Sequence, residues 1–260
     1  MDPIALDVSI PERLDWTAGR PPWRIREGLA KLQDLYGAAG EGARGWAAYD
    51  AYAAARARHD PTWPYRLTGG DVGILSLVEC TPTPAVLDVL LAPLERSHAG
   101  AGLSAIPTDW QLHDPVSDEQ WARLDELYAI VEAPGLDVRT LTRLLCVKRP
   151  RLVPALAAPA RPPRAAKKGA LARAASASTR SFRDMLLHNR LAIAEIAARM
   201  NAWLPDHTPP DQRFRLTPAR VLSELVWFDL GGWRRFHAWR EKGGEVLRAG
   251  AGERRRKASG

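Results

Sequence analysis

The chain has 260 residues, of which 46% are hydrophobic and 26% charged; this excludes a fully disordered protein and allows one large domain or two small ones. Its two cysteines, Cys80 and Cys146, have no Cys-x-x-Cys spacing, so we expect no disulfide framework, no metal site and a reducing, cytoplasmic location. No stretch approaches the roughly 18 consecutive apolar residues of a membrane helix, and no basic, apolar leader follows Met1. We therefore expect no membrane contact.

The net charge of +7 is unevenly distributed along the chain. Residues 1–134 carry 11 Lys/Arg against 20 Asp/Glu, a net −9, whereas residues 135–260 carry 26 against 10, a net +16. Two interpretations are open. The acidic half can dock on the basic half within one fold, or the basic half can bind a polyanion and release its counterions. Charge alone favours the first, because a high pI is common in proteins that bind no nucleic acid.

Apolar residues recur at three- and four-residue spacing along most of the chain, which predicts helices. After a proline-rich lead-in, helices are expected over residues 23–36 and 46–59, with a Gly-rich break between them. Residues 72–80 suit a buried helix or a strand, and a helix is favoured because Asp71 can cap it. A further helix is expected over residues 85–96, followed by a loop over residues 100–107.

The clearest helix start is Ser117-Asp118-Glu119-Gln120, which combines a capping residue with early acidic residues. That helix should end at Pro134-Gly135, where a tight turn follows. A second helix should begin near Val138 and end at Pro150. The segment therefore predicts a helix, a hairpin and a helix.

Composition changes after Pro154. Residues 155–180 contain three prolines, six Lys/Arg, no acid and almost no large apolar side chain, which predicts a flexible basic insert. Helices should follow over residues 182–204, 218–230 and 233–239, with Thr217 as a cap. We therefore predict an all-α fold: a single helical domain of about nine helices, formed by residues 1–154 and 181–250, with the insert at 155–180 and a basic tail at 251–260.

The turn at Pro134-Gly135-Leu136 resembles that of helix-hairpin-helix modules, and Thr140 and Leu144 fit the later hydroxyl and apolar positions. Asp137 stands where such modules have a second Gly, and Leu141 where they have an Ala. In these hairpins, N–H groups turned outward at a helix N-terminus bind one phosphate. The alternative is that Asp137 is an ordinary N-cap of a helix in the core.

The run from Lys148 to Pro154, Lys-Arg-Pro-Arg-Leu-Val-Pro, resembles a segment of bacterial families of unknown function, and Leu225-Val226-Trp227 adds to that resemblance. It is also similar to the stretch after the hairpin in helical DNA glycosylases, which implies a catalytic Asp nearby. Residues 155–158, Ala-Leu-Ala-Ala, stand in that place, so a glycosylase-type site is expected to be incomplete and no catalytic residue is predicted. Asp184 and Asp229 are the carboxylates on which a divergent glycosylase would depend.

The leading functional hypothesis is non-enzymatic, sequence-independent binding of the DNA backbone. The alternative is a helical protein that acts through a protein partner, with the charge asymmetry used internally or in a dimer. Separately, Lys148, Arg149 and Arg151 can either bind a phosphate or complement a helix C-terminus. No Gly-rich phosphate loop follows a strand, so no cofactor is expected, and most of the ten tryptophans are expected in the core. The residues expected to contact nucleic acid are Gly135, Leu136, Val138, Arg139, Thr140, Arg143, Lys148, Arg149 and Arg151.

Overall fold

The computed structural model describes residues 13–14, 23–37, 45–78, 80, 98–132, 135–156, 169–208, 210 and 213–232. The helices expected over 85–96 and 233–239, the tail at 251–260 and residues 157–168 of the insert lie outside these ranges. Within them the chain forms nine α-helices, so the all-α prediction is confirmed. None of these helices is long and apolar enough to cross a membrane.

The elements follow one another along the chain as short strands and then helices. A two-residue strand β1 (Arg13–Leu14) pairs antiparallel with β2 (Trp23–Arg24). The first half then contains α1 (Ile25–Gly37), α2 (Trp46–His59), the 3-10 turn η2 (Trp63–Tyr65), α3 (Gly69–Gly73), the 3-10 turn η3 (Ile74–Val78) and α5 (His98–Ser104). The second half contains α6 (Asp118–Val131), α7 (Val138–Lys148), α8 (Ala170–His188), α9 (Arg190–His207), α10 (Pro218–Trp227) and a π turn η5 (Phe228–Gly232).

Three helices begin at the capping residues that the sequence indicates. The Ser117 hydroxyl accepts from the N–H of Gln120 at 3.2 Å, and the Gln120 side chain accepts from the N–H of Ser117 at 2.8 Å, a complete capping box at the start of α6. Asp137 caps α7, and Thr217 caps α10 with Pro218 in its first turn. Each cap provides an acceptor for an N–H group that has no partner within its helix.

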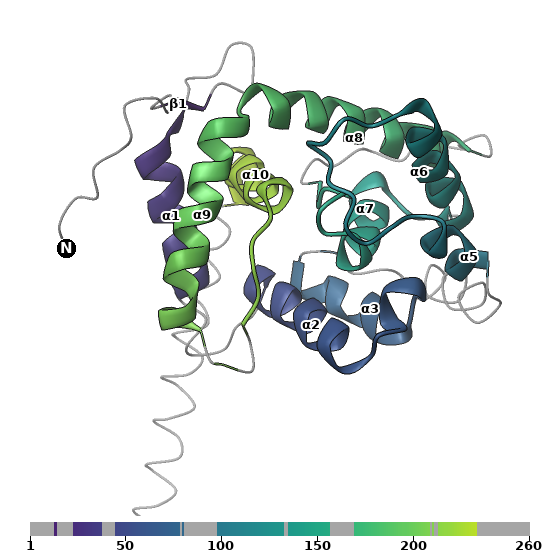
Figure 1. The fold of residues 1–260 in the computed structure, drawn as a ribbon, viewed down its shortest axis with the longest axis horizontal. Coiled ribbons are helices and arrows are strands. Elements are labelled where there is room, and N and C mark those ends of the chain that lie inside the picture. The colour runs from purple at the N-terminus through teal and green to yellow at the C-terminus, as the bar shows by residue number, and fades with distance from the viewer. Residues whose placement is uncertain are drawn as a thin grey trace, which may run out of the picture.

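The helices form two groups joined by the long helix α8 (Figure 1). Helices α1 and α9 lie side by side and pack against α10. At the other end, α6 packs against α8 and α5. Helix α8 crosses from one group to the other and bends into α9 at Asn189, whose side chain donates to the Met185 carbonyl at 2.9 Å.

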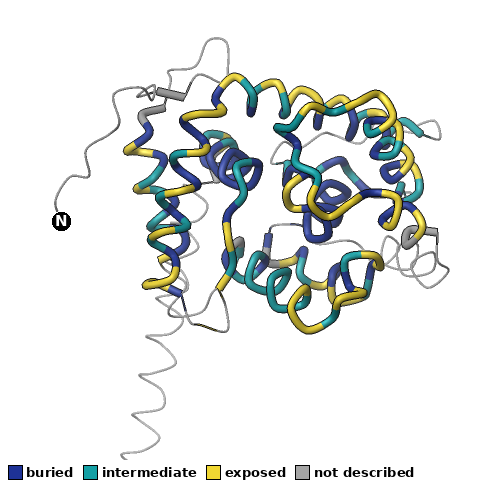
Figure 2. Tube along the Cα trace, in the orientation of Figure 1, coloured by how far each residue is buried: buried dark blue, intermediate teal, exposed yellow. Residues whose placement is uncertain are grey.

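Helix α7 lies in the middle of the domain. It contacts α2, α3, α8 and both 3-10 turns. Ten of its eleven residues are buried, and Figure 2 shows its trace mainly in dark blue. A helix buried on every side is usually apolar, yet α7 carries Arg143 and Lys148 into the interior. Their polar groups therefore need partners inside the protein.

The expectation of a flexible insert over the whole of residues 155–180 is wrong in its second half. Residues 170–180 form the first half of α8, whose Leu171, Ala175 and Thr179 are buried. The Thr179 hydroxyl shares a hydrogen bond of 2.7 Å with the Tyr128 hydroxyl of α6. Small Ala and Ser side chains let two helices approach closely, so this stretch packs without the large apolar residues whose absence suggested disorder.

Three smaller expectations also need correction. The helix predicted over 182–204 is two helices that meet at Asn189. The helix predicted after Asp71 is α3 followed by a 3-10 turn, and Thr68 is its cap while Asp71 completes the capping box. The loop predicted at 100–107 begins with α5, a short helix without a strong start signal.

Candidate functional site

The hairpin before α7 has the expected turn but not the expected anion site. Gly135 adopts φ 85° and is exposed, whereas Leu136 is buried. The Asp137 carboxylate accepts from the N–H of Thr140 at 2.6 Å, so a negative charge of the protein itself lies at the N-terminus of α7. A phosphate at this position would be repelled by that carboxylate. The capping interpretation of Asp137 is therefore the one that the structure supports.

The cations expected beside the hairpin do not share a surface. Arg143, Lys148 and Arg149 are 0%, 3% and 1% exposed, because α7 is the central helix. Val138 and Thr140 of the same set are buried as well. Arg139 is half-buried and Arg151 is exposed. The prediction that these residues together contact a polyanion is therefore wrong for the three buried cations.

Lys148 forms a fully buried ion pair with Asp71 of α3. Its Nζ lies 2.8 Å from Oδ2 of Asp71, and both side chains are 0% exposed. The same Nζ donates to the Trp63 carbonyl at 3.0 Å and lies 3.6 Å from the centre of the Trp63 ring. Burial lowers the pKa of Lys148 to about 8, and the Asp71 carboxylate limits that fall.

Asp71 has further donors that hold its carboxylate in place. Oδ1 accepts from the Trp63 indole at 2.9 Å, and Oδ2 accepts from the N–H and hydroxyl of Thr68 at 2.6 and 2.8 Å. These donors satisfy both oxygens of the buried carboxylate. The Asp71–Lys148 pair therefore fixes α3 and η2 against the end of α7.

Arg149 and Arg143 make the same kind of long-range connection through carbonyl groups. Arg149 donates to the carbonyls of Ile106 at 3.0 Å and Pro64 at 2.8 Å, and also to that of Leu103. Burial lowers the pKa of Arg149 to about 10, which leaves it charged at neutral pH. Arg143 donates to the carbonyl of Val78. The Lys-Arg sequence at the end of α7 thus binds the protein's own backbone.

A second buried ionic cluster joins α1, α2 and α10. Arg220 lies 3.0 Å from the Asp50 carboxylate through Nε and 2.9 Å from the Glu224 carboxylate through Nη2. The Tyr36 hydroxyl lies within hydrogen-bond reach of Asp50 at 3.0 Å and Glu224 at 3.2 Å. Burial raises the pKa of Glu224 to about 7, against the opposing effect of Arg220. With Glu224 at 0% and Arg220 at 3% exposure, this cluster connects helices.

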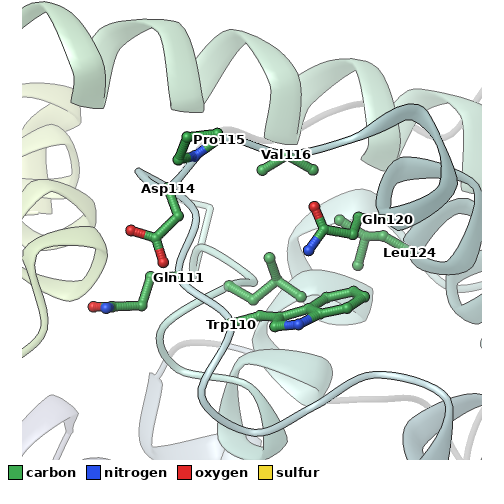
Figure 3. Close-up of a pocket in the computed structure, with 8 residues that line it drawn as sticks. Trp110, Gln111, Asp114, Pro115, Val116, Gln120 and Leu124 are labelled. Atoms are coloured by element: carbon green, nitrogen blue, oxygen red, sulfur yellow. The ribbon is translucent and has the colours of Figure 1, made fainter.

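Among the described residues, a pocket is lined by both aromatic and polar side chains (Figure 3). Its cavity volume is about 30 Å³, and the value reaches about 310 Å³ only when the open solvent at its mouth is included. The pocket lies between the loop before α6 and the start of that helix. The Trp110 indole runs along one side of it, and the Gln120 amide lies beside the ring with its nitrogen toward the pocket. The lining residues are Trp110, Gln111, Asp114, Pro115, Val116, Gln120, Leu124 and Leu152.

The polar groups of the pocket are held in defined positions. The capping box fixes the oxygen of the Gln120 amide, which leaves its NH2 group for the pocket. The Asp114 side chain is 50% exposed, and its Oδ1 lies 3.8 Å from Nε2 of His113. The carboxylate and the aromatic face suit a cationic group at the mouth of the pocket, whereas the Gln120 NH2 group is a donor and can bind only an acceptor.

The loop that carries Trp110 and Asp114 is tied to two distant segments. The N–H of Leu112 donates to the Arg151 carbonyl at 2.9 Å. Arg183 of α8 donates to the carbonyls of Leu112 at 3.0 Å and Asp114 at 3.1 Å. A pocket whose walls are fixed in this way loses little conformational entropy when a ligand binds.

The sequence did not single out this pocket. Most of the ten tryptophans were expected in the core, and Trp110 was not singled out as an exception; it is half-buried. Gln120 was noted only as a part of the helix start. Asp114-Pro115 next to an aromatic residue is a weak signal for a turn that carries a site. Within the described ranges, no group of three or more His, Cys, Asp or Glu side chains could hold a metal ion.

The fold and these sites define an all-α domain with two buried ionic clusters around a central helix and one small pocket at its surface. The chain belongs to a family of unknown function (DUF6308), whose model matches residues 29–227, from α1 to the last residue of α10. No curated protein and no solved structure matches the chain. The resemblance to DNA glycosylases therefore stays a prediction.

Proposed function

We propose that the protein binds a partner protein and that the Trp110 pocket receives a cationic side chain of that partner. The observation that carries the proposal is that an indole and a half-exposed carboxylate line the same open pocket. An arginine side chain suits this lining. Its stem packs on an aromatic face while its guanidinium pairs with a carboxylate.

The charge around the pocket favours a cation over an anion. Residues 109–120, which supply most of the lining, include four acidic residues and no Lys or Arg. Arg183 brings one positive charge against this loop and donates to backbone carbonyls, and Arg123 pairs with Glu119 at 2.5 Å. The remaining negative charge raises the local concentration of a cationic ligand.

Sequence-independent binding of duplex DNA is the competing proposal. Most of the cations that this proposal needs are not available to DNA, because Arg143, Lys148 and Arg149 bind groups inside the protein. Arg139 and Arg151 remain near the hairpin. Each phosphate contact contributes a slope of only about −0.9 to the dependence of log K on log salt, so these two cations give weak binding on their own.

Titration of ¹⁵N-labelled protein with acetyl-arginine amide tests the proposal, with acetyl-citrulline amide as an uncharged control of the same shape. The variant Trp110→Phe identifies the Trp110 indole resonance among those of the ten tryptophans. At low ionic strength we expect this resonance to shift with a dissociation constant of roughly 1–10 mM for the arginine compound. Binding of the citrulline compound, or binding to Asp114→Asn, should be at least about threefold weaker, the loss of one exposed ion pair.

Two results would contradict the proposal. One is a Trp110 resonance that does not respond to the arginine compound, or that responds equally in Asp114→Asn. The other is tight, steeply salt-dependent binding of a duplex DNA that Asp114→Asn and Trp110→Phe leave unchanged, which would make nucleic-acid binding the better function.

A further inference from the structure

We propose that a cluster of four largely buried side chains is a pH-sensitive contact between α2 and the pair α1 and α10. This Arg220 cluster comprises Tyr36 of α1, Asp50 of α2, and Arg220 and Glu224 of α10. It holds one proton on its two carboxylates while the helices are packed together, and the contact opens more readily once that proton is lost. The inference is independent of the proposed function, because the cluster shares no residue with the Trp110 pocket.

One hydroxyl hydrogen serves two carboxylates in this cluster. The Tyr36 hydroxyl lies 3.0 Å from Oδ2 of Asp50 and 3.2 Å from Oε1 of Glu224, but it can donate to only one of them at a time. If both carboxylates were ionised, one of these oxygens would face a lone pair of the Tyr36 oxygen. A proton on Oε1 of Glu224 removes this repulsion, because Glu224 then donates to Tyr36 and Tyr36 donates to Asp50.

The charges of the cluster also favour a bound proton. Arg220 lies 3.0 Å from the Asp50 carboxylate and 2.9 Å from that of Glu224, so one guanidinium faces two carboxylates. With both ionised, the cluster has a net charge of −1 in the interior, where an unbalanced charge is costly. The Glu224 side chain is 0% exposed, against 12% for Asp50, and its Oε2 has no hydrogen-bond partner among the described residues. Glu224 is therefore the carboxylate that keeps the proton.

Most other groups around Glu224 do not change charge near neutral pH. Burial raises the pKa of Cys146, on α7, to about 11, and it raises the pKa of Tyr36 and of Tyr49, on α2, well above the ordinary value. The charged side chains of α8, α9 and η5, which also pack against α10, are all at least partly exposed in the described part of the chain. They are therefore not part of the buried cluster.

Burial raises the pKa of Glu224 to about 7, and Arg220 opposes this rise. Arg143 of α7 acts in the same direction as Arg220, but its effect is smaller, and its guanidinium donates to the carbonyl of Val78. Burial raises the pKa of Asp50 as well, again against the effect of Arg220. Burial thus outweighs the attraction of the nearby cations, in agreement with the proton that the geometry assigns to Glu224.

The cluster lies at a joint between segments that are each attached elsewhere (Figure 1). Helix α2 packs against η3 and α7. Helix α10 is held on α9 by two hydrogen bonds between Asn201 and the backbone of Leu216, at 2.8 and 2.9 Å. It also packs closely on α1, where a Cβ atom at Gly28 would lie 3.0 Å from Leu225. Loss of the proton therefore weakens the contact between α2 and the other two helices without releasing either side from its own neighbours.

The direction of the pH effect follows from the two states of Glu224. When the contact opens, water reaches this carboxyl and its pKa returns toward 4.5, whereas in the closed form it is about 7. Opening therefore becomes easier as the pH rises between these values, and the effect levels off above them. Between pH 5 and pH 7.5 we expect the equilibrium constant for opening to rise by roughly 5- to 150-fold.

Native-state hydrogen exchange of the ¹⁵N-labelled full chain measures this opening, once the rates are corrected for the base catalysis of exchange itself. Between pH 5 and pH 7.5 the amides of α2 and α10 should lose protection by that factor, and those of α6, at the other end of the domain, should lose less. Glu224→Gln imitates the protonated side chain and should abolish the pH effect. The matched control Glu126→Gln, at an exposed position of α6, should leave the effect unchanged.

The ¹³C resonance of the Glu224 carboxyl in the wild type gives a second result, which does not depend on how well Glu224→Gln folds. We expect it to titrate with a midpoint above about pH 6 and the Asp50 carboxyl resonance to move in the same step, as for two groups that share a proton. A Glu224 midpoint near 4.5 would overturn the inference. So would exchange that accelerates equally in α2, α10 and α6, or a pH effect that persists in Glu224→Gln.

Discussion

Replacing Lys148 by Met separates the structural role of this lysine from the nucleic-acid contact that its sequence suggests. A lysine that meets phosphate at the surface can be replaced with little effect on stability, usually within about 0.5 kcal/mol. In the structure Lys148 instead lies 2.8 Å from the Asp71 carboxylate with neither side chain exposed. Methionine retains most of the apolar stem and removes the charge, so the substitution tests the ion pair itself.

The expected loss follows from the groups that the substitution leaves without a partner. Removing one member of a buried ion pair costs about 3–5 kcal/mol. Asp71 keeps the donors of Trp63 and Thr68, which places the loss toward the lower end of that range. The Trp63 carbonyl loses its hydrogen bond to Nζ and remains buried. This loss costs about 1–3 kcal/mol and is already included in the cost of removing one member of the ion pair. We therefore expect Lys148→Met to lower the free energy of unfolding by about 3 kcal/mol.

Urea unfolding followed by circular dichroism measures this loss, provided that the slope of the free energy against urea concentration is unchanged. Arg151→Met, at an exposed position three residues away, is the matched control and should change the stability by less than about 0.5 kcal/mol. Adding Asp71→Asn to Lys148→Met should cost less than the sum of the two single changes, since the unpaired charge is gone. A Lys148→Met protein as stable as Arg151→Met, or strictly additive losses, would refute the buried ion pair.

Three further substitutions test the ionic cluster and the hairpin. The pKa of Glu224 is raised from 4.5 to about 7, so between these pH values the folded chain keeps a proton that the unfolded chain has lost. The free energy of unfolding of the wild type should therefore fall by about 1–3 kcal/mol between pH 5 and pH 7.5, relative to that of Glu224→Gln. Urea unfolding at the two pH values measures this difference. Tyr36→Phe removes the hydroxyl near Asp50 and Glu224 and should lower the thermal midpoint by an amount that corresponds to about 1–2 kcal/mol. Asp137→Ala removes the cap on Thr140 and should cost about 1 kcal/mol in urea, whereas a gain in stability would argue against the cap.

The helix boundaries that could be predicted are those set by residues close together in the sequence. Helix α2 occupies the expected residues 46–59, between glycines and Asp60-Pro61. Helices α6 and α10 begin at Ser117 and Thr217, whose side chains bond to N–H groups three residues later. Helix α8 was missed in part, because its stability comes from α6, whose Tyr128 lies 51 residues before Thr179. Local signals cannot report a partner at that distance.

The candidate site could be predicted less well, because a buried cation and an exposed one look alike in a sequence. The partner of Lys148 is Asp71, on a different helix, and nothing near either residue indicates the other. The sequence of α7 also gives a misleading signal: Arg139 and Arg143, four residues apart, lie on one side of the helix and indicate an ordinary solvent face. The burial of Arg143 and Lys148 was therefore not predictable from the helix alone.

The buried ion pairs also explain part of the charge asymmetry between the two halves of the chain. Asp50 and Asp71 come from the acidic half, and they pair with Arg220 and Lys148 from the basic half. This agrees with the interpretation in which the halves dock within one fold. The positive charge that could attract a polyanion is then carried mainly by residues 157–168 and 233–260, while the rest of the chain is net negative. The cations of α7 and its C-terminus that bind groups inside the protein add nothing to that attraction.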